Sequence, residues 1–216
     1  MPAHNKKLVA IVDYGVNNLH SLAKAFTRCK CEVIITEDPA TVATADAIVL
    51  PGTGAFQAGM NGLKTRGLID SIRAFADTEK PILGICLGAQ LLLNTGNEFG
   101  SFPGLGIIDG SVDSFPTLKP GHKVPHFGWN GILSKGSPWN GSLLDSIREK
   151  SYVYFVHSFI MNPKNKKYIF ATSEYGGYEF CSVMRKNNIY GCQFHPEKSG
   201  IVGLKIIKNF IKIIRV

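Results

Sequence analysis

The sequence predicts an α/β protein with an open, mostly parallel sheet that is flanked by helices and extended by antiparallel strands. Up to Gly96, short β-branched segments alternate with helical segments, which is typical of a parallel sheet covered on both faces. After Gly96, short strands follow one another between glycine-rich turns, which indicates antiparallel additions. No repeat or linker divides the chain, so we expect a single domain over residues 1–216.

The first half of the chain supplies the predicted parallel core. Helix 19–28 is indicated by apolar residues three or four positions apart, such as Leu19, Leu22 and Phe26. The strand 47–50 is apolar throughout and ends at Pro51-Gly52. The predicted strands are Leu8–Asp13, Glu32–Thr36, Ala47–Leu50 and Pro81–Ile85, and the predicted helices are Leu19–Arg28, Phe56–Leu63, Leu68–Phe75 and Gly88–Leu93.

The second half is richer in glycine and proline and supplies the antiparallel strands. Gly176-Gly177 and residues 186–188 have the composition of hairpin turns. The strands expected here are Gly106–Asp109, Ile132–Leu133, Tyr152–His157, Tyr168–Ser173, Glu179–Arg185 and Ile189–Phe194. A last helix is expected over Ile201–Ile214, with a basic outer stripe and an apolar face against the sheet.

Composition excludes several classes of protein. Hydrophobic residues make up 44% and charged residues 19%, which is typical of a globular protein. The net charge of +8 comes without an aromatic-interleaved basic stripe, so we expect no nucleic-acid partner. No apolar run reaches the roughly 18 residues of a membrane span, and the polar start, residues 1–7, lacks a signal peptide. We therefore expect a soluble, cytoplasmic protein.

Five cysteines raise the question of a nucleophile. Their number is odd, no export signal accompanies them, and none has the spacing of a zinc ligand set. We therefore expect no disulfides, no metal and no cofactor.

The segment Gly84-Ile85-Cys86-Leu87-Gly88 has the form of a nucleophile elbow. An apolar strand precedes it and a helix follows, and flanking glycines allow strand and helix to pack closely around a reactive side chain. A helix start behind Cys86 favours an anion and offers backbone amides to an oxyanion. Taken alone, the pattern fits a cysteine buried at a strand end equally well.

The segment Phe194-His195-Pro196-Glu197 supplies the groups that a cysteine nucleophile needs. A strand ends at His195, Pro196 makes the turn rigid, and Glu197 follows close enough to orient the imidazole. Pro51-Gly52-Thr53-Gly54, a glycine-rich turn after a strand, could line an oxyanion position, although alone it also fits an ordinary strand–helix turn. We expect His126 at an interface and Cys192 in the core.

With these segments in place, the sequence resembles the class I glutamine amidotransferases, and within them the glutaminase subunits of imidazole glycerol phosphate synthase. The blocks that carry the closer likeness are residues 12–19, 51–56, 125–130, 154–158 and 193–199, and they span nearly the whole chain. The resemblance implies that Cys86 attacks the glutamine carboxamide, His195 transfers protons and Glu197 orients His195. It also implies an oxyanion and substrate site at Gly52, Thr53, Gly54, Leu87, Gln90, Val156, His157 and Ser158, with a peptide flip near Thr53.

The resemblance implies a partner as well as a substrate. Ammonia from glutamine would pass to a (β/α)-barrel cyclase subunit in a heterodimer that makes imidazole glycerol phosphate for histidine biosynthesis. Asn17-Asn18 and residues 127–129 would lie near the docking face. An alternative is a paralogous subunit that supplies ammonia for amidation of a surface-polysaccharide sugar. A catalytically inactive binding relative is a third possibility, but it would have no physical need to keep Cys86, His195 and Glu197 together.

Overall fold

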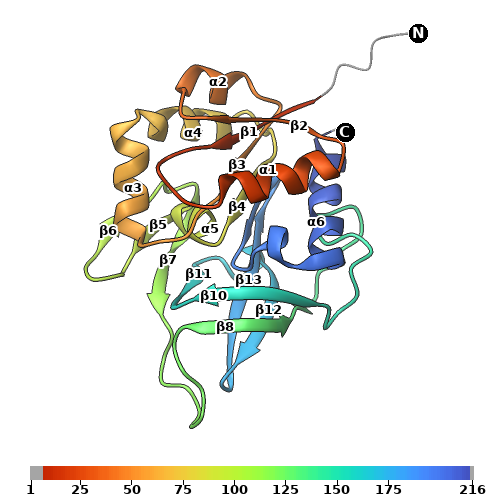
Figure 1. The fold of residues 1–216 in the computed structure, drawn as a ribbon. Helices are drawn as coiled ribbons and strands as arrows, with labels where there is room; N and C mark the ends of the chain where they lie inside the picture. Colours follow the sequence, from red (N-terminus) through yellow and green to blue (C-terminus); the bar gives the residue numbers. More distant parts are fainter. Residues whose placement is uncertain (1–6, 215–216) are drawn as a thin grey trace.

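The computed structural model describes residues 7–214, and Figure 1 shows their arrangement. Residues 1–6, most of the N-terminal segment that is predicted to lack a signal peptide, lie outside the described residues. Within them, twelve strands form one sheet and two more form a small separate sheet. None of the helices in this part of the chain is long and apolar enough to cross a lipid bilayer.

The predicted parallel core is present. Four neighbouring pairs, β1 with β2, β1 with β3, β3 with β4 and β4 with β14, are all parallel. These strands are β1 (Leu8–Val12), β2 (Glu32–Thr36), β3 (Ala47–Leu50), β4 (Ile82–Ile85) and β14 (Ile189–Cys192). Because parallel neighbours end at the same edge, Cys86 and the segment after Cys192 emerge side by side.

Antiparallel strands extend the sheet beyond β14, as predicted. The antiparallel pairs are β13 with β14, β13 with β12, β13 with β11, β12 with β9, β11 with β7, and β5 with β6. β5 and β7 pair in parallel. Their bounds are β5 Leu93–Gly96, β6 Phe102–Pro103, β7 Ile108–Ser114, β9 Leu133–Ser134, β11 Phe159–Pro163, β12 Ile169–Tyr175 and β13 Tyr178–Lys186. The separate sheet joins β8 (His126–Gly131) to β10 (Tyr152–His157) in antiparallel register.

Helices cover both faces of the parallel strands (Figure 1). Val9 and Ile11 of β1 lie in a hydrophobic cluster with α1 and α6, whereas Ala10 and Val12 lie in a second cluster with α2 to α5. Successive side chains of a strand point to opposite faces of the sheet, so a strand whose side chains are buried on both faces must be covered on both faces. The helices are α1 Leu19–Arg28, α2 Pro39–Thr44, α3 Phe56–Thr65, α4 Leu68–Ala76, α5 Leu87–Leu91 and α6 Gly200–Ile213, with 3₁₀ turns at Lys166–Tyr168 and Pro196–Lys198.

The structure differs from the sequence-based prediction in both halves of the chain. α2, β5, β6, β8 and β11 were not predicted. The helix expected over Gly88–Leu93 ends at Leu91, and Leu93 begins β5, because an apolar leucine run fits either conformation. The strand expected at Gly106–Asp109 is Ile108–Ser114. β8 has few β-branched residues and forms through its pairing with β10.

Candidate active site

Cys86 lies on a sharp turn between β4 and α5, as the elbow pattern predicted. Its backbone has φ 50° and ψ −109°, outside the regions that a residue with a side chain usually adopts. A side chain at Gly88 would overlap the carbonyl oxygen of Leu50, and one at Gly84 would lie 2.6 Å from Ala89 Cα. The two glycines therefore permit the close strand–helix contact that holds Cys86 in this conformation.

His195 and Glu197 form a buried pair beside Cys86. His195 Nδ1 is 2.8 Å from Glu197 Oε1, and the two side chains are 2% and 4% exposed. The backbone amide of His195 donates to Tyr154 O at 2.9 Å, which anchors the turn to β10. Asn18 Nδ2 also donates to Glu197 Oε1, at 3.3 Å. The carboxylate thus holds the imidazole through Nδ1 and leaves Nε2 for chemistry.

The charge state of His195 follows from its surroundings. Burial opposes the imidazolium, but Cys86 and the Glu197 carboxylate outweigh burial and raise the pKa of His195 to about 9. Cys86 is thus close enough to act on the imidazole electrostatically. Nε2 nevertheless has no hydrogen bond of good geometry to any described residue, so the two groups are close but not hydrogen-bonded.

This raised pKa predicts how stability depends on pH. The folded protein keeps the His195 proton between about pH 6.5 and about pH 9, and the unfolded chain does not. The stabilisation is therefore complete below about pH 6.5 and is lost as the pH rises through about 9. We expect wild type to lose more unfolding free energy than His195→Gln between these limits, because the variant has no imidazole to titrate. Urea titrations at both pH values measure it, and equal losses would contradict the assignment.

A pocket of about 290 Å³ adjoins Cys86 and collects most of the predicted substrate-binding residues. Thr53, Gly54, Cys86, Gln90, Val156, His157 and Ser158 line it. Gly52 instead lies in a smaller cleft with His195 and Glu197, on the other side of Thr53. Both ring nitrogens of His157 are engaged within the protein, because Nδ1 bonds Phe159 O and Nε2 meets His126.

The backbone amide of Leu87, a predicted oxyanion donor, is not free in this conformation. The backbone N–H of Leu87 donates to the carbonyl oxygen of Gly52 at 3.3 Å. Gly52 has φ 153°, and a side chain there would lie 2.6 Å from the Tyr14 hydroxyl, which itself donates to Pro51 O. The Gly52 carbonyl must therefore turn away before Leu87 can stabilise an oxyanion.

Three polar residues at the site were not assigned these roles from the sequence. Glu98 lines the pocket and accepts from Phe56 N at 2.7 Å. Gln193 is fully buried, and its Nε2 lies 3.7 Å from Cys86 Sγ. Asn18, expected only near a docking face, bonds Glu197. The position of Gln193, two residues before His195, could have indicated from the sequence that this residue belongs to the site. No local sequence feature indicates the same for Glu98.

The positions of two other side chains were also predicted from the sequence and can be compared with the structure. His126 was expected at an interface, but it is 2% exposed and stacks on Tyr175 with ring centroids 4.0 Å apart. That expectation is wrong, because the alternation of β8 turns His126 inward and Phe127 and Trp129 outward, 68% and 54% exposed. Cys192 is fully buried, as predicted, and burial raises the pKa of its thiol.

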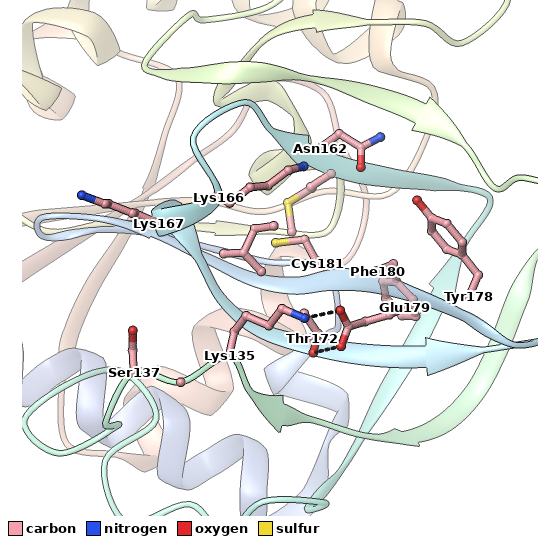
Figure 2. Close-up of a pocket in the computed structure, with 13 residues that line it drawn as sticks. Lys135, Ser137, Asn162, Lys166, Lys167, Thr172, Tyr178, Glu179, Phe180 and Cys181 are labelled. Carbon is pink, nitrogen blue, oxygen red and sulfur yellow. Dashed lines mark hydrogen bonds and ion pairs between the residues drawn. The ribbon is translucent and has the colours of Figure 1, made fainter.

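A larger hollow, of about 790 Å³, lies over β11, β12 and β13 (Figure 2). Thr172 and Lys135 both bond Glu179 there, and Cys181 lies in its floor. Burial raises the pKa of the Cys181 thiol to about 12, and no histidine lines this hollow. It therefore lacks the base that a thiol nucleophile needs. In the described part of the chain, no three His, Cys, Asp or Glu side chains gather to hold a metal.

Comparison with known proteins adds to this geometry. The family model described as glutamine amidotransferase class-I matches residues 10–214. The chain is 47% identical to imidazole glycerol phosphate synthase subunit HisH 1 of Legionella pneumophila (strain Lens) over 210 residues, covering 95% of this chain and 99% of that protein. It is 43% identical to subunit HisH of Acinetobacter baylyi, covering 94% and 97%.

Solved structures share the fold at lower identity. A structure titled as a glutamine amidotransferase superposes with a TM-score of 0.72 at 15% identity, covering 96% of this chain and 99% of that one. A chain of PurLQS from Thermotoga maritima gives 0.70 at 18% identity, covering 97% and 98%. Both likenesses concern the fold alone.

Proposed function

This chain belongs to the class I glutamine amidotransferase family, and from that premise we propose that it is the glutaminase subunit of an imidazole glycerol phosphate synthase. The observation that carries the chemistry is that Cys86 lines a pocket and also lies close enough to the buried His195–Glu197 pair to act on the imidazole. The subunit name of the relatives favours histidine biosynthesis over the surface-polysaccharide alternative.

The proposed reaction converts glutamine and water to glutamate and ammonia. The Cys86 thiolate attacks the carboxamide carbon, and protonated His195 gives its proton to the departing nitrogen as the C–N bond breaks, leaving a thioester, neutral His195 and free ammonia. His195 then removes a proton from water, which attacks the thioester and releases glutamate. Glu197 keeps the imidazole oriented and stabilises its charged form throughout.

The pocket offers complementary groups for the amino-acid end of glutamine. Gln90 Nε2 donates to Phe159 O and to Gln193 Oε1, at 3.1 and 3.2 Å, so both of its N–H groups are engaged. The acceptor Oε1 is then the part of the amide that is left for substrate. Together with the Glu98 carboxylate, it suits an α-ammonium group. We assign Gly52, Thr53, Gly54 and Leu87 to the oxyanion site once the Gly52 carbonyl turns.

The partner surface is proposed on the outward face of the β8–β10 sheet. Phe127, Trp129 and Tyr152 are 68%, 54% and 61% exposed and lie on one side of this sheet. Large exposed apolar side chains gathered on one surface are typical of protein interfaces. A barrel-shaped cyclase subunit docked here in a heterodimer would receive ammonia from the neighbouring active site. We place the complex in the cytoplasm.

One experiment tests the proposed function. Glutamate release from glutamine is measured with the purified chain alone, and then with an imidazole-glycerol-phosphate cyclase barrel subunit and its nucleotide ligand. We expect release to rise at least about tenfold with the partner, since the Leu87 amide is engaged by Gly52 in the isolated chain. A barrel subunit from an unrelated pathway is the control. A chain that the cyclase subunit does not stimulate would contradict the histidine assignment.

A further inference from the structure

The residues that line the glutamine pocket are connected to a buried pair of histidines. His157 Nδ1 lies 2.9 Å from Phe159 O, and His157 Nε2 lies 3.1 Å from His126 Nδ1. The two side chains belong to opposite strands of the small sheet, where His157 pairs with His126. They are 6% and 2% exposed, so neither can exchange its partner for water at low cost.

Hydrogen-bonding rules determine which nitrogen carries each proton. A carbonyl oxygen only accepts hydrogen bonds, so His157 Nδ1 is the protonated nitrogen. His157 Nε2 then carries a lone pair and accepts. His126 Nδ1 must then donate to it, which leaves His126 Nε2 as an acceptor facing Asn130 Nδ2 at 3.5 Å. This proton assignment is that of two neutral rings. Burial, the largest cause in each case, lowers the pKa of His126 to about 4 and that of His157 to about 3.

Packing holds the rings in place. The His126 ring stacks between Tyr175 and Phe155, with centroids 4.0 and 4.9 Å away and planes 24° apart in both cases. Phe115 packs against both histidines, at 6.5 and 5.2 Å. Rings confined in this way cannot rotate to find other partners, so the pair is a fixed element rather than an incidental contact.

From the pair, hydrogen bonds continue to the nucleophile. Phe159 O accepts from His157 and also from Gln90 Nε2. Gln90 Nε2 donates to Gln193 Oε1, which turns Gln193 Nε2 towards Cys86 Sγ, 3.7 Å away. Each amide can be oriented in only one way, because Phe159 O cannot donate. A chain of fixed donors and acceptors thus runs from β8 to the thiol.

We propose, resting on the function proposed above, that His126 and His157 are positioning residues for glutamine. As a neutral hydrogen-bonded pair, they hold the Phe159 carbonyl where it orients the Gln90 amide towards the substrate. Neither side chain needs to touch glutamine. If His126 is removed, His157 Nε2 becomes a buried acceptor without a partner, and the His157 ring must move to satisfy it. Phe159 O and the pocket wall then lose their fixed position.

The test replaces His126 in two ways. His126→Phe keeps a stacking ring and removes the donor, whereas His126→Asn restores an amide N–H near the position of Nδ1. We expect KM for glutamine to rise about tenfold in His126→Phe, with kcat changed less than about threefold, and to stay within about threefold of wild type in His126→Asn. His122→Phe is the matched control, because His122 is exposed and contacts Tyr175 outside the chain of bonds.

The outcomes separate positioning from general destabilisation. Melting temperatures are measured for all variants in the same buffer. An unchanged KM in folded His126→Phe would overturn the proposal, and so would equal increases in His126→Phe and His126→Asn. If His126→Phe does not fold, His157→Asn makes the same test, since it keeps a donor near Phe159 O but lacks the acceptor for His126.

Binding measurements distinguish this proposal from the function on which it rests. Calorimetry with L-glutamine compares Cys86→Ala with Cys86→Ala/His126→Phe, where no hydrolysis occurs. Weaker binding by about tenfold in the double variant supports the positioning role, and equal binding contradicts it while leaving the proposed function intact. If Cys86→Ala binds no glutamine, the proposed function fails and this inference fails with it.

Discussion

Replacement of Cys86 by alanine is expected to reduce glutamate release by roughly 10⁴-fold or more, because Cys86 is the thiol that lines the pocket and acts on the His195 imidazole. The fold should survive, since the elbow conformation depends on Gly84 and Gly88, and alanine at position 86 is smaller than cysteine. The measurement is glutamate formation with the cyclase subunit present, together with the melting temperature of the variant.

Cys181→Ala is the matched control for this experiment. It removes another buried thiol, from the hollow in Figure 2, where no histidine activates it. We expect its activity to stay within about threefold of wild type. If Cys86→Ala retained a substantial part of the activity, or Cys181→Ala lost it, the assignment of the nucleophile would be wrong.

Glu197→Gln is expected to lower kcat roughly 10²- to 10⁴-fold, as happens when the orienting carboxylate of a triad becomes an amide. The two side chains have nearly the same shape, and glutamine can still accept from His195 Nδ1. It no longer stabilises the imidazolium, so the pKa of His195 should fall from about 9. The pH profile of kcat and the titration of His195 by NMR report this change directly.

Glu179→Gln provides the comparison at the surface. Glu179 also carries hydrogen bonds, from Thr172 and Lys135, but it lies on the exposed edge of the hollow away from Cys86. Exposed ion pairs contribute little, so activity should change less than about twofold. A Glu197→Gln enzyme with near-normal kcat and an unchanged His195 titration would contradict the role given to this carboxylate.

Much of the fold could be predicted from local patterns. β1, β3 and α1 lie where the sequence pattern places them, because strands buried on both faces and an amphipathic helix leave strong signals in the sequence. β8 and β11 could not be predicted in this way. Their residues form strands through partners far along the chain, as when His126 of β8 pairs with His157 of β10.

The sequence by itself determined the chemistry proposed here and most of its groups: a cysteine between two glycines after an apolar strand, and a histidine and a carboxylate two residues apart at the end of another. These residues are close together in the sequence, so their spacing along the chain is enough to identify them. Only the tertiary structure decided that Glu98 reaches the pocket, that Gly52 occupies the Leu87 amide, and that His126 turns inward to His157. Each of these depends on contacts between distant segments, and a hydrogen bond across a sheet leaves no pattern along the chain.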